Sequence, residues 1–278
     1  MTRKILLTLA TFVLTCATQA QEITSAAESN TATTTQLSND NDDKYKWEFW
    51  WGGGFDLASN YMWRGFDQSY RGGNRTMLDP SLQPSVAFGY GKFYVEFWGN
   101  ASLISDYKEF DIFLGFEHEN LLITLYDVFC GVGSDFNKPF FDKRMTNHSL
   151  TATIDYTLFD RLRLHWATTF LHPDDYIETG KRAGKRAFSS YFEIAYTQPV
   201  KDLFDIEITA GASPWTGPFW CFENDMESVA KGFNVTNLSV MLNREFEIGN
   251  VALPVQLGYI YNPTTRYHYA MLIAGFSF

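Results

Sequence analysis

Cysteine and proline are scarce in this chain of 278 residues, which contains 3 Cys and 9 Pro. A small disulfide scaffold needs more cysteine and a collagen-like chain needs more proline, so both classes are excluded. Basic residues are also in short supply, because 22 Lys and Arg stand against 32 Asp and Glu, a formal net charge of −10. A dedicated nucleic-acid binder needs a basic face, and the acidic balance therefore disfavours polyanionic partners.

Long apolar runs are missing after residue 20, where the longest stretches, such as 121–125, suffice only for a strand. The sequence therefore predicts no transmembrane helix in the exported part of the chain. Aromatic residues, by contrast, are abundant, and the 25 Phe, 15 Tyr and 8 Trp exceed what the core of a soluble protein requires. With 45% hydrophobic residues, the chain as a whole does not have the composition of a disordered protein.

The first twenty residues have the pattern of a targeting segment. Two basic residues precede an apolar stretch from Ile5 to Leu14, and Thr18 and Ala20 supply small residues before a cleavage point at Gln21. This pattern predicts a secretory signal peptide over residues 1–20. Cys16 allows a second interpretation, a lipoprotein with a lipidated cysteine, although the residues before it match that signal poorly.

Residues 21–45 are dominated by small and polar side chains, so we expect a disordered periplasmic leader there. From residue 46 onward, apolar and polar positions alternate in short segments separated by turn residues, as in strands that cross a membrane within a closed barrel. The pattern predicts an all-β domain over 46–278, a transmembrane antiparallel up-and-down β-barrel of about twelve strands. The candidate strands are 46–59, 81–89, 92–101, 108–117, 121–129, 148–156, 162–171, 188–197, 203–213, 233–243, 251–262 and 266–278.

The connections between these strands are unequal in length. Those that follow even-numbered strands are brief, whereas the long ones, at 60–80, 130–147, 172–187 and 213–232, follow odd-numbered strands. Short periplasmic turns and longer external loops are typical of bacterial outer-membrane barrels, and an even strand number leaves both termini in the periplasm. The predicted location is therefore the outer membrane of a Gram-negative bacterium.

Two further patterns favour a membrane barrel. The apolar faces that we assign contain no charged residue, and Lys or Arg on a lipid face at mid-membrane costs about 2 to 4 kcal/mol. Aromatic residues near strand ends suggest interfacial girdles, for which the candidates are Trp47, Trp51, Trp98, Trp215, Phe219 and Trp220. A secreted soluble sandwich or lipocalin-like barrel is the alternative, but it explains neither the loop asymmetry nor the aromatic bands.

Three motifs in the first third of the barrel resemble those of the TorF-type porins, a family of bacterial outer-membrane barrels of poorly defined function. A Ser-x-Tyr-x-x-Arg-Gly opening contains Tyr61, Arg64 and Gly65, a Pro-x-x-Gln strand contains Gln83, and an aromatic strand contains Trp98. The rest of the chain agrees with that family only in architecture. The resemblance implies a porin-like role and supplies no catalytic residue.

The polar faces of the predicted strands define a net-acidic lumen. Its expected lining residues are Glu96, Glu109, Asp111, Asp155, Arg163, His165, Glu193, Asp205 and Glu207. An acidic wall favours cations or neutral solutes if the lumen is open. A narrow twelve-stranded barrel can equally be closed by these carboxylates pairing with Arg163 or with loop arginines such as Arg64, and the sequence leaves both states open.

An enzyme embedded in a barrel is the rival class, because lipid-modifying hydrolases of the outer membrane use serine and histidine. The best candidates, His148 and Ser149, are adjacent on a strand and project to opposite faces, so they cannot easily share a proton. The sequence therefore predicts no catalytic residue. It also contains no nucleotide-binding fingerprint and no close-spaced metal-ligand cluster, so we expect no cofactor and no metal.

Two features of the external connections suggest contacts beyond the lumen. Lys181, Arg182, Lys185 and Arg186 either bind phosphates of lipopolysaccharide or form a solvated basic loop. Cys130 and Cys221 either form a disulfide or remain as buried thiols. The expected partners are therefore outer-membrane lipid, lipopolysaccharide and a small solute.

The sequence thus predicts a porin-like outer-membrane channel that passes or binds a small solute. A structural or adhesion barrel without transport is the main alternative, and a lipid-modifying hydrolase is the third.

Overall fold

The computed structural model describes residues 47–68, 78–132, 146–223, 228–248 and 251–277. The expected signal peptide at 1–20 and leader at 21–45 lie outside these residues. Among the described residues, no helix is long and apolar enough to cross a membrane.

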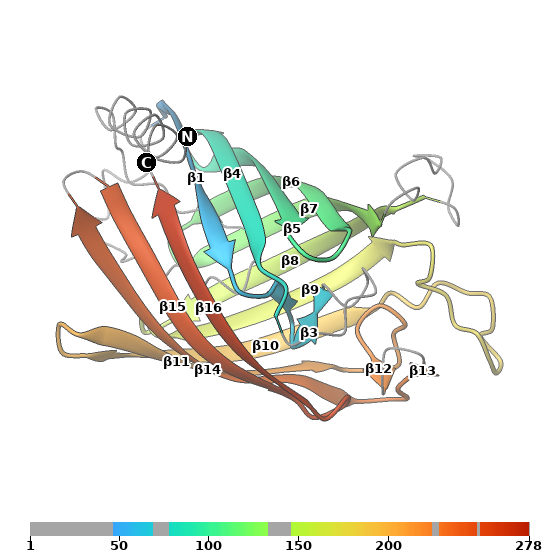
Figure 1. The fold of residues 1–278 in the computed structure, drawn as a ribbon. Helices are drawn as coiled ribbons and strands as arrows, with labels where there is room; N and C mark the ends of the chain where they lie inside the picture. Colours follow the sequence, from blue (N-terminus) through green and yellow to red (C-terminus); the bar gives the residue numbers. More distant parts are fainter. Residues whose placement is uncertain (1–46, 69–77, 133–145, 224–227, 249–250, 278) are drawn as a thin grey trace, which may run out of the picture.

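Twelve antiparallel strands close into a single barrel, as the sequence predicts (Figure 1). Each strand pairs with its neighbours along the chain, and β1 closes the barrel by pairing with β16. The barrel strands are β1 (Phe49–Ala58), β4 (Ser81–Tyr90), β5 (Phe93–Ser102), β6 (Tyr107–His118), β7 (Leu121–Val132), β8 (His148–Leu158), β9 (Leu162–Leu171), β10 (Ser190–Val200), β11 (Phe204–Ser213), β14 (Asn234–Ile248), β15 (Val251–Asn262) and β16 (Tyr267–Ser277).

Two short hairpins interrupt this series. The first, β2 (Met62–Trp63) with β3 (Phe66–Asp67), lies in the connection after β1, and the second, β12 (Phe222–Glu223) with β13 (Ser228–Val229), lies in the connection after β11. Period-two alternation cannot reveal strands of two residues, so the sequence treats both segments only as loops.

The two ends of the barrel differ as the connection lengths predict. The start of β1, the end of β16 and the short turns lie at one end, and the long connections lie at the other end (Figure 1). The β8–β9 turn shows why the short turns are tight: Phe159 and Asp160 both have positive φ, 55° and 56°, which is the twist-compatible mirror-image turn of a hairpin. The end where β1 begins and β16 ends corresponds to the periplasmic side.

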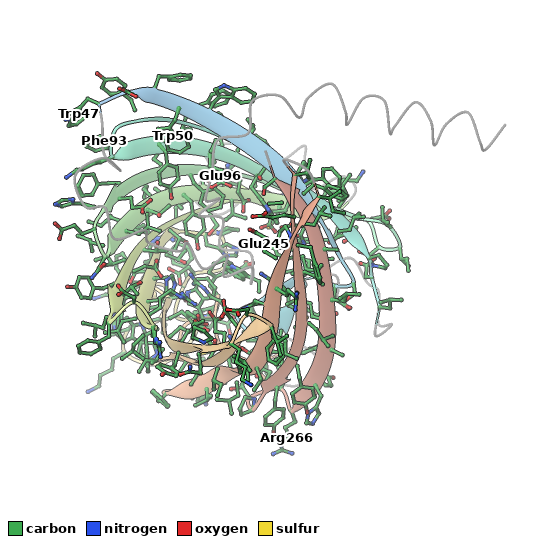
Figure 2. All side chains as sticks on the ribbon, turned by 90° about the vertical axis from the view of Figure 1, so that its left-hand side faces the viewer. Trp47, Trp50, Phe93, Glu96, Glu245 and Arg266 are labelled. Carbon is green, nitrogen blue, oxygen red and sulfur yellow. The ribbon has the colours of Figure 1, made fainter. Side chains whose placement is uncertain are left out.

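The outer wall of the barrel is apolar. Trp47 and Phe93 lie outside the wall, whereas Glu96 lies inside (Figure 2). The outward positions of the strands are mostly large hydrophobic side chains, and the exposed ones include Phe49, Leu57, Phe88, Phe110, Leu114, Ile123, Leu125, Ile154, Trp166, Ile194, Ile208, Val240, Leu257 and Leu272. This surface is unlike that of a soluble protein and fits a hydrocarbon environment.

Three of the residues expected in the aromatic girdles are instead buried. Trp98 is 4% exposed, Phe219 5% and Trp220 0%, while Trp47, Trp51 and Trp215 are exposed. Trp98 shares the inward face of Glu96 on β5, and the connection that carries Phe219 and Trp220 enters the barrel. The position of a residue relative to a strand end predicts its height along the barrel axis. It does not show whether the side chain faces the lipid or the lumen.

The outer wall also carries a charge that the strand pattern did not predict. Asp127 on β7 shares its face with the exposed Leu125, and its Oδ2 lies 2.7 Å from Nδ1 of His148 on β8. The His148 ring stacks on Phe129 at 4.6 Å between ring centroids. Pairing with histidine reduces the cost of placing a carboxylate on this face.

Candidate functional site

The connection after β1 folds into the lumen and forms the centre of the candidate site. All residues from 60 to 68 are buried, and β2 and β3 are joined by Arg64 and Gly65. Both have positive φ, 52° and 84°, as a two-residue mirror-image turn requires. The Arg-Gly pair of the motif is therefore the tip of a hairpin, and we refer to residues 60–68 as the inserted hairpin.

The tip of the inserted hairpin touches the inner wall at β14 and β15 at very short range. A Cβ atom added to Gly65 would lie 1.9 Å from the backbone oxygen of Thr236, which leaves no room for a side chain. Asn262, at the end of β15, donates from Nδ2 to the Gly65 oxygen at 2.9 Å. Glycine at this position therefore lets the tip pack directly against the barrel backbone.

Arg64 is held by a histidine and by aromatic rings. Its Nη2 lies 3.0 Å from Nε2 of His165 on β9. Because a guanidinium only donates, His165 accepts at Nε2, and its Nδ1–H then donates to Oδ1 of Asp155 at 2.9 Å. The guanidinium carbon also lies 4.1 Å from the ring centroid of Trp220 and 4.7 Å from that of Tyr191. These contacts give the buried cation a partner on several sides.

The polar network extends from His165 along the inner wall. Arg163 bridges two carboxylates, with Nη1 3.2 Å from Asp155 and Nη2 2.6 Å from Glu193. Tyr191 and Asn237 also donate to Oε2 of Glu193, at 2.5 and 3.1 Å. On the inner wall formed by β8 to β10, Arg163 thus offsets part of the negative charge of Asp155 and Glu193.

The other end of the inserted hairpin meets carboxylates through hydroxyl groups. Tyr61 donates to Oε1 of Glu109 at 2.9 Å, and Tyr107 donates to the second oxygen of the same carboxylate. Asp111 lies two residues further along the inner face of β6 and is 4% exposed. Tyr61 also packs on Trp98, with ring centroids 5.3 Å apart.

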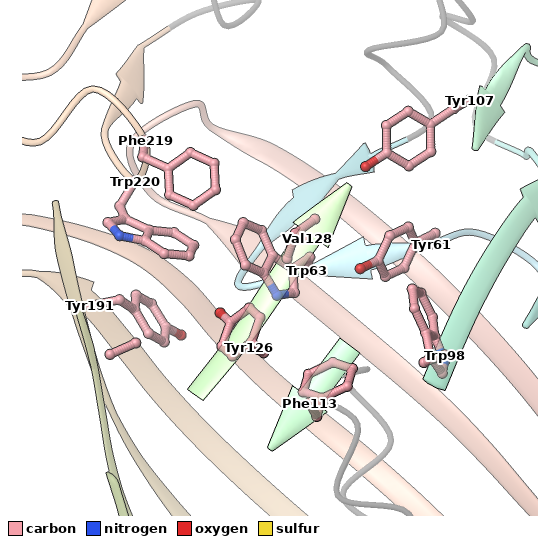
Figure 3. Close-up of a cluster of buried hydrophobic side chains, with 11 residues drawn as sticks. Tyr61, Trp63, Trp98, Tyr107, Phe113, Tyr126, Val128, Tyr191, Phe219 and Trp220 are labelled. Atoms are coloured by element: carbon pink, nitrogen blue, oxygen red, sulfur yellow. The ribbon is translucent and has the colours of Figure 1, made fainter. Parts of the chain in front are cut away.

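Aromatic side chains from two connections and four strands fill the space around the inserted hairpin (Figure 3). Trp63 packs on Trp220 at 4.3 Å and on Phe219 at 5.5 Å between centroids. The complete cluster contains Tyr61, Trp63, Trp98, Tyr107, Phe113, Tyr126, Val128, Ala167, Tyr191, Phe219 and Trp220. The interior is therefore not only polar, in contrast to the lumen that the sequence suggests.

A second apolar cluster supports the opposite side of the inserted hairpin. Met62 packs there with residues of β14, β15 and β16, and the cluster contains Ala58, Met62, Met241, Ile260, Met271 and Ile273. The hairpin therefore has contacts around much of the barrel circumference, because it also reaches β6 and β9 through Tyr61 and Arg64.

The residues expected to line the lumen all project inward, at two degrees of burial. Those below 9% exposure are Glu96, Glu109, Asp111, His165, Glu193 and Glu207, and those of intermediate exposure are Asp155, Arg163 and Asp205. Their role in lining a conducting pore stays a prediction. The structure joins Asp155, Arg163, His165 and Glu193 in one network, and it places Glu207 beside Thr197 and Thr209.

The motif residues meet at two places rather than one. Tyr61, Arg64, Gly65 and Trp98 surround the inserted hairpin, whereas Gln83 on β4 donates to Ser81 and Asn100. Sequence reasoning missed the partners supplied by distant segments, namely Tyr107, Tyr191, Trp220 and Asn262. No spacing rule connects these positions to residues 61–65.

The structure also bears on the two cysteines Cys130 and Cys221 and on the pair His148 and Ser149. Cys130 and Cys221 form no disulfide with each other in the structure, where Cys221 is buried and Cys130 is of intermediate exposure. His148 pairs across the strands with Phe129, and Ser149 pairs with Val128, so the two side chains lie on opposite faces of β8. The described residues contain no group of three or more His, Cys, Asp or Glu that could hold a metal.

No family model and no curated protein matches the chain, so the resemblance to the TorF-type porins is not confirmed. Among solved structures, the NanC porin is similar at 7% identity and a TM-score of 0.44, covering 81% of this chain and 98% of that one. An outer-membrane channel from Pseudomonas putida F1 is similar at 13% identity and a TM-score of 0.41, covering 86% and 99%. These values are too low to transfer a function.

The structure of the barrel indicates where in the cell the protein lies. A closed barrel satisfies every backbone hydrogen bond of its strands, and its apolar outer wall is suited to lipid. The long connections at one end, and the short turns at the end where β1 begins and β16 ends, have the polarity of bacterial outer-membrane barrels. The chain is therefore an outer-membrane β-barrel with a hairpin inserted in its lumen.

Proposed function

We propose that the protein is an outer-membrane channel that passes or binds a small cationic or neutral solute. In this proposal the inserted hairpin forms the constriction of the channel. The observation that carries it is the fastening of the hairpin, which is held in the lumen by side-chain hydrogen bonds from Tyr61 and Arg64 as well as by packing. Such contacts can be exchanged for contacts with water or solute, whereas backbone pairing within the barrel cannot.

The charges of the inner wall support the choice of solute. Among the described inward-facing residues, acidic side chains outnumber the basic Arg64 and Arg163; the acidic ones named here are Asp56, Glu96, Glu109, Asp111, Asp155, Glu193, Asp205 and Glu207. Arg163 compensates Asp155 and Glu193, but Glu207 is held by threonine hydroxyls. A passage bordered by an excess of carboxylates raises the local concentration of cations.

Conductance of the purified, refolded chain in a planar bilayer tests this proposal. The lumen variant Glu96→Gln/Glu207→Gln removes two inward charges and keeps Arg163 paired. The matched control, Glu178→Gln/Asp202→Asn, removes two exposed charges from connections outside the lumen. We expect the wild-type chain and the control to favour cations, as read from the reversal potential in a salt gradient, and the lumen variant to lose part of that selectivity.

Two outcomes would contradict the proposal. A correctly folded barrel that conducts no ions, both as wild type and after replacement of Arg64 by Ala, would exclude a channel and favour a structural or adhesion role. Equal selectivity in the lumen variant and the control would show that inward carboxylates do not act on the permeating ion.

A further inference from the structure

The connection between β9 and β10 forms an ordered hairpin outside the barrel, and it extends well beyond the strand ends (Figure 1). Ile177 donates its amide to the Lys185 oxygen at 2.9 Å, and Gly184 donates to the Ile177 oxygen at 2.7 Å. Tyr176 forms an antiparallel bridge with Arg186. These contacts define the shape of the segment between its tip and its base.

A buried carboxylate fixes the base of this external hairpin. Asp175 is 0% exposed, and it accepts hydrogen bonds from the amides of Phe188 and Ser189, each at 3.1 Å, and from Oγ of Ser189 at 2.5 Å. Arg186 donates to the Tyr176 hydroxyl at 2.9 Å and lies over the Tyr176 ring. Arg186 is thus part of the support, and the other basic residues of the segment remain available for contacts outside it.

Aromatic side chains directly below the external hairpin mark the level of the membrane surface. Trp166 packs on Trp215 at 6.0 Å and Phe170 packs on Phe188 at 6.4 Å, and all four rings are 40% to 45% exposed on the outer wall. Phe170, next to the end of β9, and Phe188, just before β10, lie where exposed aromatic rings occupy the interface between hydrocarbon and headgroups, whereas Trp166 lies in the middle of β9. The base of the external hairpin therefore lies at headgroup level on the extracellular side.

The tip of the external hairpin carries a cluster of positive charge in an acidic protein. Lys181, Arg182 and Lys185 are exposed, and no ion pair joins them to any carboxylate in the described part of the chain. Residues 179–186 contain no acidic side chain, whereas the whole chain has a net charge of −10. Lys185 is three residues from Phe188, so their Cα atoms are at most about 10 Å apart. Its ammonium group can therefore reach the headgroup layer.

We propose that Lys181, Arg182 and Lys185 bind the phosphate groups of lipid A in the outer leaflet. The hydrogen-bonded backbone of the external hairpin holds the three residues close together, which lowers the entropic cost of binding, and phosphate is the anion present at the level of the aromatic residues. The proposal rests on the outer-membrane location and is independent of whether the barrel conducts.

The test compares lipid binding by the full chain refolded in zwitterionic nanodiscs. The probe is fluorescent bisphosphorylated lipid A, with dephosphorylated lipid A as the second probe. The binding variant is Lys181→Gln/Arg182→Gln/Lys185→Gln. The control, Arg161→Gln/Lys201→Gln/Arg244→Gln, removes the same charge near the periplasmic turns.

We expect the wild type and the control to prefer the bisphosphorylated probe, and the binding variant to bind it on the order of 100-fold more weakly, from roughly a fivefold loss for each charge removed. Conductance of the binding variant should be unchanged, which separates this result from the channel proposal. Equal binding by the binding variant and the wild type would overturn the proposal. So would an equal loss in the control, or full displacement of the probe by millimolar inorganic phosphate, which would assign the tip to a free anion.

Discussion

The two ends of the inserted hairpin are fastened to the barrel by different chemistry. At the Arg64 end, a guanidinium, a neutral histidine and a second arginine connect the carboxylates of Asp155 and Glu193. At the Tyr61 end, the described contacts to Glu109 come from phenol hydroxyls. At the Arg64 end, arginine side chains thus offset the charge of the carboxylates. At the Tyr61 end, hydroxyl groups hydrogen-bond to a carboxylate without offsetting its charge.

We therefore expect the two ends to contribute different free energies to holding the hairpin in the lumen. A hydrogen bond that involves a charged group contributes about 1.5 to 3 kcal/mol, and each end of the hairpin makes at least one such bond. A buried arginine also gains from aromatic rings that exclude water. We therefore expect the Arg64 end to hold the hairpin in place and the Tyr61 end to orient it.

The largest effect is expected from Arg64→Ala. The change removes the donor to His165 and the cation that packs on Trp220 and Tyr191, so the free energy of unfolding should fall by about 3 kcal/mol. Release of the hairpin should also raise single-channel conductance. Urea unfolding in lipid vesicles and planar-bilayer recording measure the two effects. Unchanged stability and conductance would show that packing of Trp63 and Met62 alone holds the hairpin.

Gly65→Ala tests the tip of the hairpin, directly beside Arg64. The new methyl group would meet the Thr236 oxygen, and alanine is strained at a φ of 84°, so we expect a loss of about 2 kcal/mol in the free energy of unfolding. Gly232→Ala is the matched control, because Gly232 has a φ of 76° but no atom within 4 Å of the added Cβ. If both variants lose the same stability, the backbone strain matters and the close approach does not.

A smaller effect is expected from Tyr61→Phe. The ring remains packed on Trp98 and the hydrogen bond to the Glu109 carboxylate is lost, so the free energy of unfolding should decrease by about 1.5 kcal/mol. Conductance should change little if this end only orients the hairpin. A gain in conductance as large as that of Arg64→Ala would reverse the ranking of the two ends.

The smallest effect concerns Asp175, a buried carboxylate outside the membrane-spanning strands. Burial raises its pKa above the ordinary value, although hydrogen bonds from Ser189 and the nearby Arg186 act in the opposite direction. The folded segment therefore takes up a proton more readily than the opened one. Local stability should rise as the pH falls through the folded pKa and decline slightly as the pH rises from the ordinary value.

Amide hydrogen exchange of residues 172–189 between pH 4 and pH 7, corrected for intrinsic rates, measures this dependence. Asp175→Asn should remove the pH dependence while it keeps the size of the side chain. If the variant retains the wild-type dependence, another group near the external hairpin is titrating.

The sequence predicts the barrel well because its wall repeats one simple pattern. Each of the twelve predicted segments overlaps one barrel strand, and most bounds agree within two residues, as for β9 and β15. The main difference is β14, which continues to Ile248 because alternation persists past Asn243. Lipid outside and a closed ladder of hydrogen bonds constrain every strand in the same way, so local alternation is sufficient evidence.

The sequence predicts which residues belong to the candidate site but not how they are arranged. Glu109, Asp155, Arg163 and Glu193 are recognisable from the inward positions of their strands. The roles of Trp98 and Trp220 are not, because the same aromatic residue suits a lipid interface or a packed interior. The Arg-Gly pair at 64–65 resembles a family motif, but its function as the tip of a hairpin depends on the fold.

By itself the sequence determined the class of the protein, the number and order of the twelve barrel strands, and which face of most of these strands is apolar. These properties follow from neighbours in the chain, since a period of two and a turn are local. Only the tertiary structure decided that residues 60–68 enter the lumen, because Arg64 finds His165 and Gly65 finds Thr236 across large separations in sequence. These contacts form only after the barrel has closed, because only then do strands on different sides of the lumen lie close enough for one hairpin to reach them.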